Sequence, residues 1–129
     1  MGTFAVQVRL PDGREAEVFV DTGATFSKLP ARDLESLGVQ PSFEVEVELG
    51  DGTVARRDVG YVELEVQERR RIVPVAFGGV GERSLLGATA LEILGFAVDP
   101  SRQELVPTRS LEIWGLSPPE TPGGLRTHA

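Results

Sequence analysis

Asp21-Thr22-Gly23 is the segment of this sequence with the clearest capacity for chemistry, and it directly follows the apolar run Val18-Phe19-Val20. Such a run is typical of a buried strand, and an acid at its end, followed by a tight turn, is carried into the protein rather than into solvent. A carboxylate held in this way can accept or donate a proton during hydrolysis. The tripeptide alone is a weak signal, because an Asp at this place can also cap an ordinary turn.

The composition removes most other catalytic groups. The single histidine, His128, is the penultimate residue, which argues against a Ser-His-Asp triad and a multi-histidine zinc site. The chain has no cysteine, which excludes thiol nucleophiles, disulfides and thiolate metal sites. If the protein is an enzyme, we therefore expect carboxylates to transfer the proton, without a cofactor or a metal.

The charge of the chain narrows the range of partners. With 20 acidic and 13 basic residues the formal net charge is −7. Such a surface repels phosphate backbones, so nucleic acid is not expected as a partner. The one basic run, Arg69-Arg70-Arg71, is expected to form a solvated hairpin turn between two strands. No stretch approaches the roughly 20 apolar residues that span a membrane, so we expect a cytoplasmic protein without a membrane partner.

The elements that must position Asp21 are mostly short strands. Alternating apolar residues predict strands at 4–10 and, after the turn Pro11-Asp12-Gly13, at 15–20. Pro30 and Gly38 bracket a short helix, because proline is favoured where a helix begins and glycine where it ends. Further strands are expected at 43–49, from residue 54 onwards, and at 61–66, 72–77, 96–98 and 104–106. A second helix is expected at 89–94. This pattern predicts an all-β barrel or sandwich.

Residues 43–49 alternate apolar side chains with Glu44, Glu46 and Glu48, and Gly50-Asp51-Gly52 follows as a hairpin turn. A cation site built from these glutamates is possible in principle. The alternation instead indicates the solvent face of one strand, because successive side chains of a strand point to opposite sides.

The length of 129 residues fits one domain. We expect the folded domain at 1–107. Residues 108–129 are crowded with proline and glycine, which favours an extended tail. The segment 111–116, which contains Trp114, is a candidate for docking on the domain or on a partner.

The order of these elements resembles the retroviral-type (retropepsin-like) aspartic proteases, in particular their small bacterial members. The resemblance covers residues 4–107. It includes the Asp-Thr-Gly-Ala-Thr segment with a helix soon after it, and a hairpin at 49–56 where the family has its flap. A second apolar element, Leu85-Leu86-Gly87, leads into a helix and a last hairpin. The resemblance implies a closed acid-protease barrel with one or two short helices, active as a two-fold homodimer.

The same resemblance implies roles for individual residues. Asp21 would be the catalytic acid, and the residues that support its loop would be Thr22, Gly23, Ala24 and Thr25. Gly23 would bring its amide to the carboxylate, and Gly87 would allow the loop to pass close by. Thr22 would reach across the dimer axis and form a hydrogen bond with the equivalent loop of the partner. The expected flap residues are Gly50, Asp51, Gly52 and Val54. The expected substrate-pocket residues are Val80, Arg83, Leu85, Leu86 and Gly87.

One acid cannot perform this hydrolysis alone. One ionised carboxylate must take a proton from water while a protonated one polarises the peptide carbonyl, and two adjacent carboxylates divide these roles because they do not both ionise readily. The chain has one Asp-Thr-Gly, so Asp21 is expected to meet Asp21 of a second copy across a two-fold axis. The predicted function is an aspartic endopeptidase that cleaves extended peptide segments.

The sequence departs from the viral pattern at two positions. Thr25 and Ala88 stand where many viral enzymes place an acid and an arginine that form ion pairs across the dimer. The segment around Trp114 is a candidate substitute for these contacts. Ala24 lacks the hydroxyl that pepsin-like enzymes carry, which predicts a mildly acidic pH optimum.

Two other functions fit the same residues. The first is a non-catalytic dimeric module that keeps the fold and binds extended peptides. The second is an unrelated β-barrel or sandwich with a structural role, in which Asp21 only caps a turn. Replacing Asp21 by Asn separates the first from the enzyme, and a strictly monomeric protein in solution would favour the second.

Overall fold

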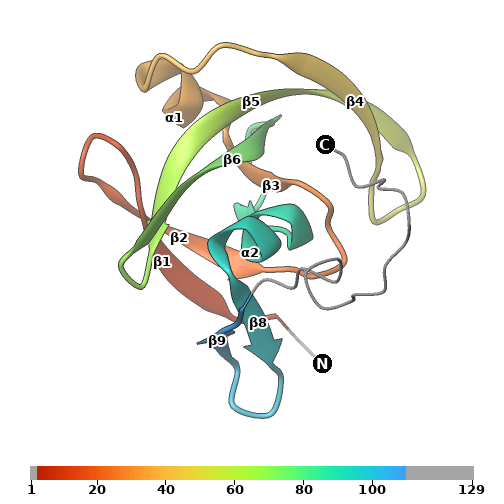
Figure 1. Cartoon of the computed structure of the whole chain (residues 1–129). Helices are drawn as coiled ribbons and strands as arrows, with labels where there is room; N and C mark the ends of the chain where they lie inside the picture. The colour runs from red at the N-terminus through yellow and green to blue at the C-terminus, as the bar shows by residue number, and fades with distance from the viewer. Residues whose placement is uncertain (1–2, 110–129) are drawn as a thin grey trace, which may run out of the picture.

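The computed structural model describes residues 3–109, and in this part of the chain nine strands and two short helices are present (Figure 1). The strands are β1 (Ala5–Arg9), β2 (Glu15–Val20), β3 (Ser27–Pro30), β4 (Phe43–Glu48), β5 (Val54–Val66), β6 (Arg69–Gly78), β7 (Leu85–Leu86), β8 (Phe96–Asp99) and β9 (Glu104–Pro107). The helices are α1 (Ala31–Ser36) and α2 (Ala88–Leu94). Trp114 and most of the expected tail lie outside the described residues.

Seven strands form one sheet in the order β1-β2-β7-β3-β6-β5-β4, and β8 and β9 form a separate hairpin. The sheet closes on itself because β1 also pairs with β5, where Arg9 lies opposite Glu65. Strand β4 therefore lies outside the closed ring, beyond β5, and in Figure 1 the β4–β5 hairpin curves along the outer side of the molecule. The predicted all-β closed barrel with two short helices is confirmed.

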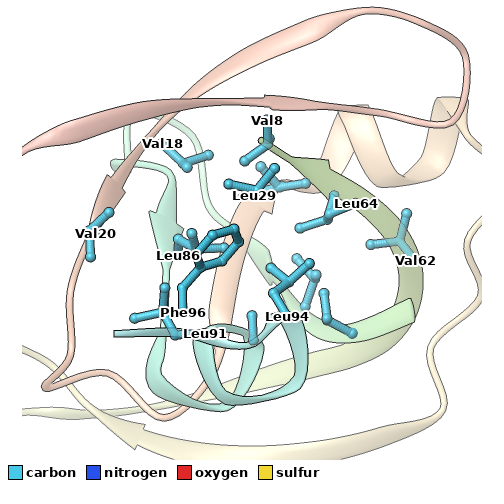
Figure 2. Close-up of a cluster of buried hydrophobic side chains, with 14 of the residues drawn as sticks. Val8, Val18, Val20, Leu29, Val62, Leu64, Leu86, Leu91, Leu94 and Phe96 are labelled. Atoms are coloured by element: carbon cyan, nitrogen blue, oxygen red, sulfur yellow. The ribbon is translucent and has the colours of Figure 1, made fainter. Parts of the chain in front are cut away.

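The core fills the barrel and explains why these segments form strands. In β5 the buried residues Val62, Leu64 and Val66 alternate with more exposed ones, which is the period of a strand with one face inward. Helix α2 contributes Leu91 and Leu94, and Figure 2 shows them among the side chains of the surrounding strands. No helix in residues 3–109 is long and apolar enough to cross a membrane.

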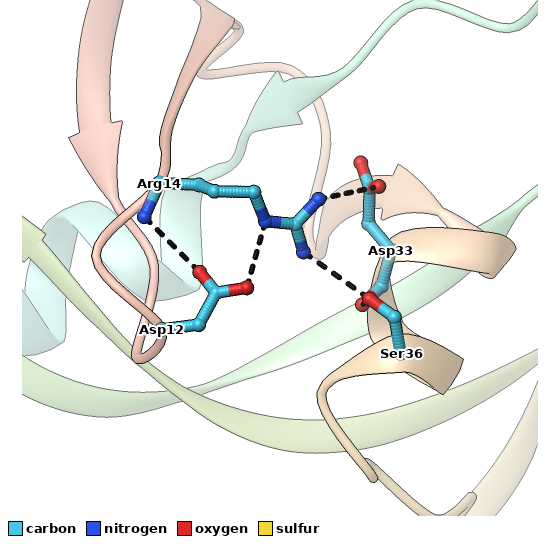
Figure 3. A network of polar contacts seen from close by, with 4 residues as sticks. All are labelled: Asp12, Arg14, Asp33 and Ser36. Carbon is cyan, nitrogen blue, oxygen red and sulfur yellow. Dashed lines mark hydrogen bonds and ion pairs between the residues drawn. The ribbon is translucent and has the colours of Figure 1, made fainter.

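The first hairpin turns as its sequence predicts. Gly13 has a φ of +91°, and its N–H donates to the carbonyl of Leu10 at 2.9 Å. Arg14, just after the turn, donates through Nε to Asp12 at 2.7 Å and through Nη2 to Ser36 Oγ in α1 at 3.2 Å (Figure 3). This exposed network connects the first hairpin to α1.

The expected turn at Arg69-Arg70-Arg71 is wrong. The two-residue turn is Gln67-Glu68, with φ values of 49° and 70°, and Arg69 already belongs to β6. Arg69 is half-buried, and its Nη1 donates hydrogen bonds to the carbonyls of Leu94 and Gly95 at 2.9 and 2.8 Å. A cation at the carbonyl end of a helix is favourable, so Arg69 caps α2.

Two features of the sheet differ from the sequence-based expectation. Strand β3 was not predicted, since its four residues show no apolar alternation. Strand β5 is one strand of 13 residues, although only its two ends had been expected. Gly60 in its middle allows the segment before β4 to pack closely against β5, because a Cβ there would lie 2.7 Å from Val39 Cγ1 and 2.8 Å from the carbonyl oxygen of Gln40.

Candidate active site

Asp21 lies where strand β2 leaves the barrel. Strand β2 runs parallel to β7, with Val20 opposite Leu86, and the Asp21 N–H donates to the carbonyl of Leu86 at 3.0 Å. The backbone of Asp21 is therefore held by a segment 65 residues later in the sequence. This contact determines where the acid leaves the sheet.

The turn after Asp21 orients its carboxylate. The Gly23 N–H donates to Asp21 Oδ1 at 3.0 Å, and the Ala24 N–H donates to the Asp21 carbonyl at 3.1 Å. A Cβ on Gly23 would lie only 3.3 Å from Oδ1, so glycine leaves room for this close approach. The amide contact expected for Gly23 is present, and Asp21 itself is half-buried.

The second loop, around Gly87, packs directly against the Asp21 loop. A Cβ on Gly87 would lie 2.7 Å from the carbonyl oxygens of both Ala24 and Phe26. The next two amides bind the same loop, because Ala88 N–H donates to Ala24 and Thr89 N–H donates to Thr25, at 2.7 and 3.1 Å. No side chain fits at position 87, and the two loops pass as closely there as the family resemblance implied.

Ser27 is the buried polar residue that the sequence analysis missed, and its side chain is 1% exposed. Its hydroxyl accepts a hydrogen bond from the Gly87 N–H at 2.9 Å. A buried N–H without a partner is costly, so Ser27 stabilises the junction of the two loops. No local sequence signal marks Ser27, because its partner lies 60 residues away.

The carboxylate faces a cavity of about 810 Å³ between the barrel and the β4–β5 hairpin. The lining residues come from the Asp21 loop, β3, β4 and its turn, β5, β6 and β7: Asp21, Gly23, Ala24, Thr25, Phe26, Lys28, Val45, Glu46, Val47, Glu48, Leu49, Gly50, Arg57, Ala76 and Leu85. A hairpin above an acid leaves room for an extended segment between them.

The hairpin at the position of the expected flap is well formed. The Leu49 N–H donates to Thr53 at 2.8 Å, and Asp51 accepts from the Thr53 hydroxyl at 2.6 Å. Together with the Thr53 N–H, this hydroxyl lowers the pKa of Asp51 from its ordinary value. Of the expected flap residues Gly50 lines the cavity, whereas Asp51, Gly52 and Val54 are exposed and lie outside its lining.

The residues expected in the substrate pocket divide into three groups. Leu85 lines the cavity, and Gly87 supports the Asp21 loop. Leu86 belongs to the core with no exposed surface, so its expected place in a pocket is corrected: alternation in β7 turns it inward. Val80 is fully exposed, and Arg83 lies over the ring of Phe19 at 4.2 Å. A substrate role for Val80 and Arg83 stays a prediction.

The cavity is also lined by two cationic side chains, Lys28 and Arg57, which the sequence analysis did not single out. Arg57 Nη2 lies 2.5 Å from Glu82 Oε2, and Lys28 Nζ lies 3.4 Å from Glu82 Oε1. The hydrogen bond from the Gly79 N–H lowers the pKa of Glu82 below its ordinary value of 4.5, and the charges of Arg57 and Lys28 lower it further. Burial of the carboxylate raises the pKa but does not outweigh these effects. These residues lie on separate elements, so the sequence gives no sign that they meet.

Thr22 lies on another side of the loop. It is exposed and lines a second cavity of about 510 Å³ together with Ala88 and Leu91. Its expected contact with a partner's loop stays a prediction. Within residues 3–109 no group of three His, Cys, Asp or Glu is placed to hold a metal ion.

Comparison with known proteins agrees with this geometry. Residues 6–90 match the sequence model of the aspartyl protease family. Since the match covers more than half of the 129 residues, the chain belongs to the aspartyl protease family.

Among solved structures, the solution structure of the simian foamy virus (mac) protease is similar, with a TM-score of 0.54 and 20% sequence identity. The match covers 69% of this chain and 92% of the viral chain. The fold is accordingly that of the retroviral-type aspartic proteases. A comparison with curated proteins gave no match.

Proposed function

We propose that the protein is a cytoplasmic aspartic endopeptidase that acts as a homodimer, with one Asp21 from each subunit at a shared site. One observation carries the proposal: the Asp21 carboxylate accepts the Gly23 N–H and lines a cavity beneath a hairpin, and the loop that carries it packs against Gly87. The family of the chain supports hydrolysis by this acid.

The need for a second copy follows from the chemistry. The ionised Asp21 takes a proton from water as the water oxygen bonds to the peptide carbonyl carbon. The protonated Asp21 of the second subunit gives its proton to the carbonyl oxygen, which produces a tetrahedral diol. The C–N bond then breaks as the first Asp21 gives the proton that it took from water to the nitrogen, and the second Asp21 takes a proton back from one hydroxyl of the diol. One proton must be shared between two neighbouring acids, and the Asp-Thr-Gly sequence occurs once in this chain.

An extended peptide is the substrate that suits the cavity. The β4 side presents Val45, Val47 and Leu49, which can pack on alternate side chains of a strand. The turn of this hairpin is exposed, and its closure over a bound peptide would exclude water from the two acids.

The test combines inactive and active chains. Asp21→Asn should abolish cleavage of an unfolded protein such as casein, while binding of peptide persists. When the Asp21→Asn chain is added in excess to the wild type and allowed to exchange subunits, the cleavage rate should fall, because mixed dimers hold one ionisable acid.

Each outcome of this test separates the candidate functions. A wild-type rate that is unchanged by the excess of Asp21→Asn chain would contradict a shared site. Peptide binding without any cleavage by the wild type, in a protein confirmed as a dimer, would favour the non-catalytic binding module.

A further inference from the structure

The corner of the cavity formed by Lys28 and Arg57 carries a net positive charge. Each of the two side chains contributes one positive charge, and they share the single carboxylate of Glu82. Lys28 and Arg57 are 20% and 13% exposed, so both are largely removed from solvent, and both line the cavity that Asp21 faces. Charges in such a place are screened less than surface charges.

Glu82 has little capacity left for other donors. Its Oε1 accepts the Gly79 N–H at 2.9 Å and pairs with Lys28, and its Oε2 accepts from Arg57. A guanidinium carries five N–H donors, and in residues 3–109 the Arg57 side chain forms one hydrogen bond, with Glu82. Donors of Arg57 and Lys28 therefore remain for a ligand in the cavity.

The glutamates of β4 that also line the cavity are more exposed to solvent than the two cations. Arg57 lies opposite Val45, and both line the cavity, whereas Arg56 lies opposite Glu46 and is not part of the lining, to which Glu46 and Glu48 also contribute. Arg56 and Glu46 form an ion pair, and both are 66% exposed. Glu46 and Glu48 are exposed residues, so solvent screens their charges more than that of the half-buried Glu82, and Glu46 is already paired with Arg56.

We propose that this corner is a subsite for an acidic side chain, Asp or Glu, of the peptide that Asp21 cleaves. Lys28 and Arg57 would be specificity-determining residues, and a carboxylate of the substrate would complete the pairing that Glu82 alone leaves incomplete. On the inner side, Lys28 lies opposite Ala76, whose small side chain leaves room beside it. The inference rests on the proposed endopeptidase function, because it names the substrate of the same site.

The experiment uses paired peptides that differ in one charge. A library of extended decapeptides contains every sequence in two forms, with Glu or Asp at one position and with Gln or Asn there. Cleavage by the wild type, read by mass spectrometry at low salt, should favour the acidic form about fivefold at one position relative to the cut. Capture of the same library by the full-length Asp21→Asn chain should show the same preference without turnover.

Variants of the corner change the preference in opposite directions. Lys28→Gln should reduce the acid-to-amide ratio towards one, and Glu82→Gln should raise it, since Lys28 and Arg57 then lose the carboxylate that they share. Arg56→Gln is the matched control: it removes a cation from the same strand on the outer face and should leave the ratio unchanged. Destabilisation alone does not raise the ratio in one variant and lower it in another.

The outcomes distinguish this inference from the proposed function. A ratio near one in both cleavage and capture, or an equal loss with Arg56→Gln, overturns the acidic subsite. Acidic capture by Asp21→Asn with no cleavage by the wild type supports the subsite and overturns the endopeptidase. If no peptide of either form is captured or cleaved, both are overturned.

Discussion

At the scale of single residues, the candidate site depends on groups that make several contacts at once. Gly87 touches two carbonyls of the Asp21 loop and donates its N–H to Ser27, and Glu82 joins three donors from separate elements. Because each of these residues contacts at least two segments of the chain, a substitution there should alter the packing of both segments. The geometry around Asp21 is thus set by residues that do not themselves face the cavity.

Glu82 should make the stability of the protein depend on pH. Its pKa is lowered in the folded state, so its contribution is present above its ordinary value of 4.5 and is lost as the pH falls through the lowered value. Glu82→Gln should therefore destabilise the protein by about 1 kcal/mol at pH 7, a figure reduced because the side chain is 30% exposed. The deficit should shrink below pH 4.5 in thermal unfolding followed by circular dichroism.

The matched control is Glu17→Gln, which removes an exposed glutamate that forms no ion pair within residues 3–109. Its melting temperature should follow the wild type at every pH. A constant deficit for Glu82→Gln between pH 3 and 7 would show that the charge of Glu82 is not what stabilises this corner.

At the scale of elements, the turn between β5 and β6 retains strain. Gln67 and Glu68 both have positive φ, a conformation that favours Asn-Gly and disfavours other residues. The tight two-residue connection is imposed by the register, in which Val66 lies opposite Arg69. Arg69 then reaches the end of α2, which explains why a poor turn sequence is retained.

Replacing Glu68 by Gly should stabilise the protein by about 0.5–1 kcal/mol, because glycine adopts positive φ without a steric penalty. A gain of a few degrees in melting temperature is expected for a domain of this size. The matched control, Glu63→Gly in the interior of β5, should instead destabilise by about 1 kcal/mol. If both variants melt below the wild type, the turn is not strained.

The elements that could be predicted are those with a local signal. Apolar alternation and glycine turns predicted the first hairpin and the β4–β5 hairpin, and proline or glycine at helix ends predicted the helices. The Asp-Thr-Gly sequence predicted Asp21 as the candidate acid. The short strand β3 could not be predicted, since Ser27 and Lys28 are polar and their partners lie on β6 and β7. For the same reason the meeting of Lys28, Arg57 and Glu82, and the burial of Leu86, depend on how distant segments pair.

At the scale of the whole molecule, the proposed site is incomplete in one copy of the chain. The barrel presents one Asp21, and two are needed to share the proton. The specific activity should therefore fall on dilution, with the rate approaching the square of the protein concentration once dimers dissociate. Initial rates over a thousandfold dilution, compared with the dimer fraction from analytical ultracentrifugation, would measure this. A specific activity that stays constant while the protein is monomeric would rule out the shared site.

The pairing of β2 with β7 also affects the order of events while the chain is being made. Asp21 leaves the ribosome early, but its backbone partner Leu86 and the amides of Ala88 and Thr89 follow more than 60 residues later. Contacts between such distant segments form late in folding. A nascent chain therefore carries its acid unassembled for most of its synthesis, and translation products that stop before residue 89 lack the neighbouring loop and would be harmless to the polypeptides around them.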